Sequence, residues 1–271
     1  MRCPLHTGAL LGALLGGLGL GTAQADPWIP AAGHGTAKPA VRLFSGDTSF
    51  PSTGFTTSTV PASKQSITQL RLTGITGLGD GLALTYDLRW GNIQTSRHGQ
   101  SASSSGLQDE EIGLAYGLTQ TAFFADALTL NVVLPAGQTK PAPAQGTGRW
   151  ALEPDFEAGL HYHRVSATLL AGPRVFLDGK AVQLRTELDL SARATPRLTF
   201  MGSVFFVDTP QSARSLPPGA QGEIYNLLRL GVGVEYRLTR RFRPFFMYET
   251  NVAGKGIHAG NRFDFGIAVK Y

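Results

Sequence analysis

Charged side chains recur at alternate positions along several segments of the chain. Arg185, Glu187 and Asp189 form one such row, and Asp87 with Arg89 forms another. Residues two apart on a β-strand point to the same side of the sheet, so each row presents its charge to one face. A row with both signs can line a pore and set its selectivity, or it can form an ion-pair network that fills a narrow barrel. Both interpretations stay open at this stage.

A second candidate for chemistry is the sequence His161-Tyr162-His163, which Glu157 precedes on the same face of a strand. Imidazole and carboxylate ligands together suit transition metals. Two histidines without a third clear ligand make a poor zinc site, however. We therefore expect two polar residues that face an interior near a tight turn, and we predict no metal and no cofactor.

Covalent catalysis has no local signature in this chain. Serine is frequent, but mostly in loop-like stretches such as Ser101–Ser105, and no Gly-x-Ser-x-Gly nucleophile elbow is present. The prediction is that the protein is not an enzyme. Because catalytic triads are assembled in space and not in sequence, an enzyme acting on lipid stays as an alternative.

The first 25 residues have the pattern of a secretory signal peptide. Arg2 precedes the apolar stretch Leu10–Gly21, and Ala23-Gln24-Ala25 supplies an A-x-A cleavage site before Asp26. The one cysteine of the chain lies in this segment, at Cys3, so the mature chain is predicted to have no disulfide and no thiolate site. We expect an exported protein of a Gram-negative cell, cleaved after Ala25.

Composition narrows the class of protein further. Charged residues make up 16% of the chain, 34 residues are glycine, and the formal net charge is +5. Hydrophobic residues make up 42%, which disfavours disorder. The basic residues are scattered singly instead of clustering on one face, so we predict no nucleic-acid partner.

Period-two alternation of apolar and polar residues predicts long strands. In the last eleven residues Phe263, Phe265, Ile267, Val269 and Tyr271 alternate with polar or small residues. Strands of nine or more residues match what a tilted strand needs to cross a bilayer. Twelve strands are predicted, over about 39–50, 64–76, 81–94, 108–119, 124–136, 153–163, 166–177, 181–193, 197–208, 222–238, 241–251 and 261–271.

The connections between these strands alternate in length. The even-numbered ones are short turns, whereas most odd-numbered ones are long and rich in Gly, Ser, Pro and Ala: Arg97–Leu107, Gln138–Leu152, Thr209–Gln221 and Asn251–Gly260. This pattern is typical of outer-membrane barrels. The predicted fold is an all-β, closed antiparallel transmembrane β-barrel of about 12 strands with periplasmic N- and C-termini. Its domains are a signal peptide (1–25), a periplasmic N-terminal segment (26–38) and the barrel (39–271).

Strand parity assigns side chains to the lumen and to the lipid. Aromatic residues near strand ends are predicted to form girdles at the two interfaces: Phe50, Phe55, Trp90, Trp150, Tyr162, Phe242 and Tyr271. The predicted lumen-lining set is Arg71, Asp87, Arg89, Glu111, Glu157, His161, His163, Arg185, Glu187, Asp189, Arg229, Glu235, Arg237, Arg243, Glu249 and Asp264. Both signs are present, so the set predicts no strong preference for anions or cations.

Four short motifs give the chain a resemblance to a known family. They are Trp28-x-Pro30-x-x-Gly33-x-Gly35, then Leu43-Phe44-Ser45-x-Asp47, then Gly106-Leu107-x-Asp109-x-x-Ile112-Gly113-Leu114-x-Tyr116, and Leu134-Pro135-x-Gly137. Their order resembles outer-membrane proteins described as phenol meta-degradation pathway transporters. The Tyr-Gly-Leu-Thr turn usual before the third strand is replaced by Thr76-Gly77-Leu78-Gly79. The resemblance implies passage of apolar or aromatic small molecules.

The function predicted from the sequence is therefore an outer-membrane channel or transporter for small, apolar or aromatic molecules. The expected partners are outer-membrane lipid, a small-molecule solute and the barrel-assembly machinery, which would recognise the last strand ending in Tyr271. The alternative, from another class of function, is a structural or interaction barrel with a closed lumen.

Overall fold

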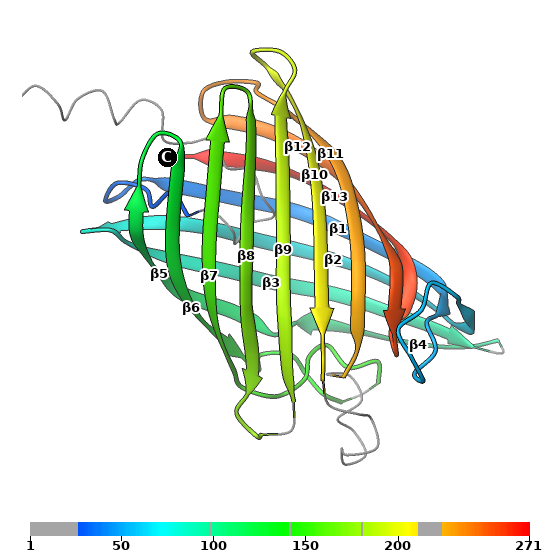
Figure 1. Cartoon of the computed structure of the whole chain (residues 1–271). Helices are drawn as coiled ribbons and strands as arrows, with labels where there is room; N and C mark the ends of the chain where they lie inside the picture. The colour runs from blue at the N-terminus through cyan, green and yellow to red at the C-terminus, as the bar shows by residue number, and fades with distance from the viewer. Residues whose placement is uncertain (1–26, 98, 141, 180, 211–223) are drawn as a thin grey trace, which may run out of the picture.

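The computed structural model describes residues 27–97, 99–140, 142–179, 181–210 and 224–271 (Figure 1). The predicted signal peptide and its cleavage site lie outside these residues. The strands are β1 Gly35–Ser49, β2 Val60–Gly79, β3 Leu82–Arg97, β4 Gln100–Leu107, β5 Glu110–Gln120, β6 Phe124–Leu134, β7 Ala151–Tyr162, β8 Val165–Phe176, β9 Val182–Arg193, β10 Leu198–Asp208, β11 Asn226–Tyr236, β12 Phe242–Lys255 and β13 His258–Lys270.

These strands form one closed antiparallel sheet. Each strand from β5 to β13 pairs with the next, β13 pairs with β1, and β1, β2 and β3 continue the ring back to β5. β4 and β5 both pair with β3, on successive stretches of it, and only Gln108 and Asp109 separate them. They therefore act as one interrupted strand, and the described residues form the predicted barrel of twelve strands.

The barrel carries its apolar side chains outward. Leu114 is 53% exposed, Leu160 is 59% exposed and Val232 is 63% exposed. Their neighbours on the other face include Asp87, Glu111 and Glu157, none more than 1% exposed. A soluble β-sandwich would bury the apolar face instead, so this arrangement fits a barrel whose outer wall contacts lipid.

No helix among the described residues is both long and apolar enough to cross a membrane.

The two ends of the barrel differ in their connections. At one end, which we call the short-turn end, the connections are residues 80–81, 121–123, 163–164, 194–197 and 237–241. The opposite end, the loop end, carries residues 50–59 and 135–150 as longer connections, but the turn between β12 and β13 at that end is only residues 256–257. The predicted alternation of short turns and long loops therefore holds for part of the barrel.

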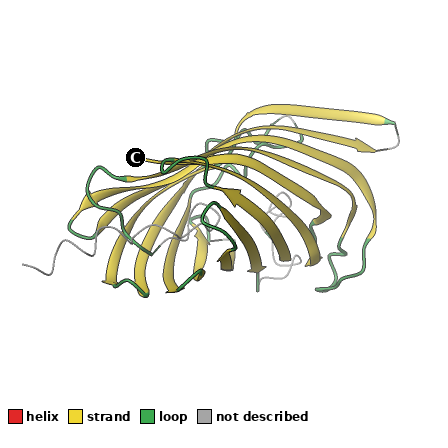
Figure 2. Ribbon diagram, turned by 90° about the horizontal axis from the view of Figure 1, so that it is seen from above, coloured by secondary structure: helices red, strands yellow, loops and turns green. Residues whose placement is uncertain are grey.

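Two of the predicted loops are strands. Residues 100–107, placed within the loop Arg97–Leu107, form β4 and lengthen the β3 hairpin beyond its neighbours (Figure 2). Within Asn251–Gly260, β12 continues to Lys255 and β13 begins at His258. Polar, small-residue sequence can continue a strand where its backbone pairs with a partner, and composition alone does not reveal that pairing.

Candidate functional site: the barrel lumen

A cavity of about 960 Å³ lies in the lumen toward the loop end. Residues of that end, including Phe50, Tyr225 and His258, form its rim. Phe50 is only 3% exposed, so it belongs to the cavity and not to the predicted lipid-facing girdle. Among the described residues, seven arginines and three glutamates line the cavity: Arg42, Arg71, Arg89, Arg174, Arg185, Arg229, Arg262, Glu111, Glu187 and Glu249.

One continuous ion-pair network crosses strands β2, β3, β5, β7, β8 and β9. Asp87 accepts hydrogen bonds from Arg71 at 2.8 Å and from Arg89 at 2.9 Å. Glu111 accepts from Arg89 at 2.9 Å and from Arg174 at 2.7 Å. Glu153 closes the network by pairing with both Arg174 and Arg185. The network fixes one side of the lumen wall.

A second group of charges covers the opposite side, on β1, β11, β12 and β13. Arg42 forms a two-pronged ion pair with Asp264, with nitrogen–oxygen distances of 2.6 and 2.8 Å. Arg262 pairs with Glu249 at 3.1 Å. Arg229 instead donates to the amide oxygen of Asn251 at 3.0 Å.

The arginines form the water-facing layer of both groups. Their side chains are 13–20% exposed, whereas those of Asp87, Glu111, Glu153, Glu249 and Asp264 are 0–9% exposed. A solute in the cavity therefore meets the guanidinium N–H groups of these ion pairs first, with their carboxylates behind them, whereas Glu187 lines the cavity itself. This asymmetry comes from side-chain length and was not evident from counting charges.

The guanidinium carbons of Arg185 and Arg229 also lie 5.4 and 5.2 Å from the ring centroid of Phe205 on β10. These distances fit cation–π contacts. Phe205 itself lines the cavity, so an aromatic face lies between two cations at the wall.

Most of the remaining predicted residues lie on the inward side of their strands, nearer the short-turn end. Glu157 accepts a hydrogen bond from Thr129 at 2.6 Å, and Arg243 pairs with Glu235 at 3.5 Å. Asp189 is buried on β9, and Arg237 lies just beyond the end of β11.

The two histidines do not share a face. His161 follows Gly159 on the inward side of β7, but His163 lies exposed in the turn at φ 54° and packs its ring against Tyr162 at 4.2 Å. The prediction that His163 lines the lumen is therefore wrong, because the chain reverses direction at that residue and strand parity ends there.

At least five charged lumen residues were missed in the sequence. Glu153, Asp155 and Arg262 share parity with Glu157 and Asp264, so extending those rows would have found them. Arg42 and Arg174 have apolar neighbours on their inward faces, Phe44 and Leu170. An inward apolar residue breaks the alternation from which a face is assigned.

The loop of residues 135–150 is tied to the break between β4 and β5. Asp109 accepts hydrogen bonds from Gly137 N at 3.3 Å, Thr147 N at 2.6 Å and Thr147 Oγ1 at 2.7 Å. Gln145 donates to the carbonyl of Ser104 at 2.8 Å. The Gly-Leu-x-Asp and Leu-Pro-x-Gly motifs thus meet in space, and their contact holds this loop against the wall.

The N-terminal segment, residues 27–34, folds across the short-turn end of the lumen. Trp28 donates from its indole nitrogen to the Thr121 carbonyl at 3.2 Å, and the side chain of Gln120 accepts from Ile29 N at 3.0 Å. A Cβ added to Gly159 would lie 2.3 Å from Cζ3 of Trp28, so the indole needs glycine at that position.

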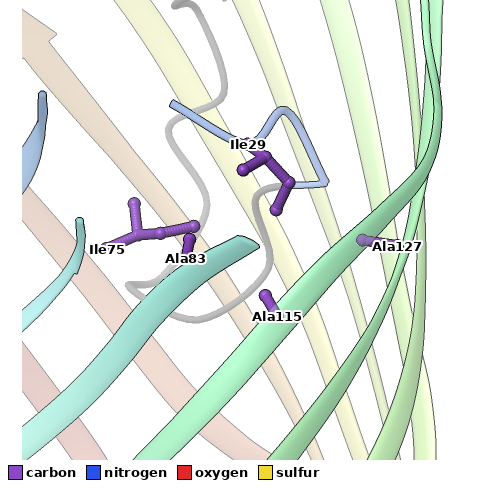
Figure 3. Close-up of a cluster of buried hydrophobic side chains, with 5 residues drawn as sticks. All are labelled: Ile29, Ile75, Ala83, Ala115 and Ala127. Atoms are coloured by element: carbon purple, nitrogen blue, oxygen red, sulfur yellow. The ribbon is translucent and has the colours of Figure 1, made fainter. Parts of the chain in front are cut away.

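Ile29 anchors the same segment from inside the barrel. It is 7% exposed and belongs to a small apolar cluster with Ile75, Ala83, Ala115 and Ala127 (Figure 3). Alanines on three neighbouring strands leave room for its side chain. The N-terminal segment therefore has its own packing site in the lumen.

No protein-family model matches the chain, and no curated protein matches it. Several solved structures do match its fold. An outer-membrane channel from Pseudomonas putida F1 matches with a TM-score of 0.71 at 14% identity, over 93% of this chain and 100% of that one.

Two further barrels match less closely. The NanC porin gives a TM-score of 0.53 at 10% identity, covering 86% of this chain and 100% of its own. The translocator domain of the autotransporter NalP from Neisseria meningitidis gives 0.56 at 11% identity, covering 88% of both chains. At these identities the likeness establishes the fold, which is that of outer-membrane β-barrels.

Proposed function

We propose that the protein is an outer-membrane channel for small solutes, with both chain termini on the periplasmic side. The observation that carries the proposal is the cavity of about 960 Å³ at the loop end, which is lined by charged and aromatic side chains. A barrel that served only as a scaffold would gain stability by filling this space. The fold shared with the Pseudomonas putida F1 channel supports the same conclusion.

The proposed solute is small and has an apolar or aromatic body. Phe44, Phe50 and Phe205 contribute apolar surface to the cavity beside the arginines. Twelve strands enclose a narrower lumen than the 16–18 strands of wide aqueous porins. Membership of the phenol meta-degradation transporter family, suggested by the four sequence motifs, is part of this proposal.

The proposed orientation places the short-turn end in the periplasm, as in bacterial outer-membrane barrels. Tyr271 then ends the last strand on that side, 45% exposed, where the assembly machinery would meet it. Sequencing the N-terminus of protein from the outer-membrane fraction should read Asp-Pro-Trp. Recovery in the soluble periplasmic fraction would contradict both the orientation and the location.

A closed structural barrel is the second candidate, and the N-terminal segment across the short-turn end favours it. Reconstitution separates the two. Purified protein in planar bilayers should produce discrete conductance steps, and liposomes that contain it should admit a small aromatic alcohol faster than protein-free liposomes. If neither current nor solute entry is seen, the closed barrel is the better description.

A further inference from the structure

Arg229 differs from the other arginines of the cavity. The other six each form an ion pair with a carboxylate. Arg229 donates a hydrogen bond to Asn251 and lies over the ring of Phe205, and the carboxylates of Glu187 and Glu249 act on it only at longer range. Its positive charge therefore lies at the cavity surface without an ion pair among the described residues.

Arg262, two strands away on β13, does not use all of its hydrogen-bond donors. It pairs with Glu249 through one terminal nitrogen, while its Nε is buried and has no hydrogen-bond partner among the described residues. Arg42 on β1 adds a third guanidinium to the same side of the cavity. A buried donor without a partner is costly, so the guanidinium of Arg262 is incompletely paired in this arrangement.

Phe205 gives this side of the cavity an aromatic surface. In the β10–β11 pairing, Phe205 lies directly opposite Arg229, and both line the cavity. A planar ring can pack against Phe205 with an energy beyond simple area burial. A guanidinium next to it offers a planar pair of N–H groups that suits a carboxylate. The two features lie side by side.

We propose that this side of the cavity is a binding site for a small aromatic carboxylate. The carboxylate lies between Arg229 and Arg262, where it gives Arg229 an ion-pair partner, and the ring of the ligand packs against Phe205. The inference rests on the proposed function, because it names the solute class that the channel would admit. It narrows the apolar or aromatic solute to one that also carries a negative charge.

Simpler ligands fit these residues less well. A neutral aromatic molecule would take water away from Arg229 without replacing its hydrogen bonds. An inorganic anion would pair with the arginines but leave Phe205 uncovered. The cavity, at about 960 Å³, has room for a ligand of single-ring size.

Equilibrium binding tests the site without requiring transport. Benzoate, benzyl alcohol and acetate would be titrated calorimetrically into the detergent-solubilised mature protein. We expect benzoate to bind at least tenfold more tightly than either of the other two. Equal affinities for benzoate and benzyl alcohol would overturn the carboxylate site, and equal affinities for benzoate and acetate would overturn the aromatic part.

Variants locate the site. Arg229→Gln should weaken benzoate binding at least tenfold, and Phe205→Leu should weaken benzoate while leaving acetate unchanged. Arg164→Gln, in the exposed turn between β7 and β8, is the matched control and should bind as the parent does. Unchanged benzoate affinity in a folded Arg229→Gln protein would overturn the proposal. Should that variant fail to fold, Arg229→Lys, which keeps the charge but loses the planar fork, should still weaken binding severalfold, and full retention would count against the site.

Conductance separates this inference from the proposed function. If the parent protein carries current, millimolar benzoate should reduce the chloride current, and Arg229→Gln should abolish that block. Conductance without benzoate binding would support the channel and contradict the binding site. Benzoate binding without conductance or solute entry would contradict the channel and support the binding site.

Discussion

Six of the seven arginines around the cavity are held by carboxylates that lie closer to the wall. Glu153 shows how the arrangement works, because its two oxygens pair with Arg174 and Arg185 on the next two strands. Strand parity was sufficient to predict that charges such as Asp87 and Arg185 face inward. Which residue pairs with which depends on register between strands, and the sequence of one strand carries no record of that register.

Glu153→Gln should destabilise the barrel by about 3 kcal/mol. The substitution leaves two arginines without their shared carboxylate, and breaking a buried ion pair costs about 3–5 kcal/mol. The lower end applies because water in the lumen reaches both arginines, which are 13% and 15% exposed. Reversible urea unfolding in lipid vesicles measures the change. Asp178→Asn, whose pair with Arg149 is 28% exposed on the aspartate side, should lose less than about 1 kcal/mol.

At the scale of strands and loops, alternation predicted all twelve barrel strands but missed the extra pairing of β4 with β3. The reason lies in residues 100–105, whose small polar side chains have no apolar periodicity. The loop 135–150 was predicted as a connection, yet its contact with Asp109 joins segments that are 28 and 38 positions apart. Contacts of that range depend on the closed barrel, not on local sequence.

Leu130→Arg should cost about 2–4 kcal/mol of folding stability in bilayers. Leu130 lies in the middle of β6 and is 50% exposed on the outer wall, so the guanidinium would enter the apolar part of the membrane. Gln65→Arg, in which a cavity-lining side chain of similar length is changed, is the matched control and should shift stability far less. Equal losses in the two variants would mean that the faces are assigned wrongly.

Asp109→Ala should release the loop of residues 135–150 from the wall. Three hydrogen bonds from Gly137 and Thr147 would lose their acceptor, at a cost of about 2 kcal/mol. Limited digestion with proteinase K should cut this loop at least severalfold faster than in the parent protein. Asp47→Ala, on the exposed face of β1, should leave the cutting rate unchanged.

For the molecule as a whole, the N-terminal segment decides how far the lumen is open. The Pro- and Gly-rich sequence of residues 26–38 does not by itself distinguish a segment anchored in the barrel mouth from a mobile tail. The glycine at position 159 was the available signal, since it makes space for the indole of Trp28, but its meaning depends on a contact across 131 positions of the chain. Nothing local to Gly159 or to Trp28 indicates that contact.

Trp28→Ala should raise single-channel conductance at least twofold, because the indole and its hydrogen bond to Thr121 hold the segment across the short-turn end. Gly159→Ala should have a similar effect, since the added methyl group would occupy the place of the indole. Planar-bilayer recordings compare both with Trp150→Ala, which removes a 50% exposed tryptophan and should leave conductance unchanged. Parent-like conductance in all three variants would show that the segment does not limit the passage.

The seam between β1 and β13 also sets the order of events when the protein is made. The ion pair of Arg42 with Asp264 joins positions 222 apart, so the ring cannot close until the last strand has arrived. Contacts between such distant residues form slowly. Residues 27–34 are attached directly to the first strand, and they lie inside the finished ring. We expect the segment to enter the barrel while its wall is still open. After closure it would have to enter through the short-turn end, where the surrounding turns would hinder it.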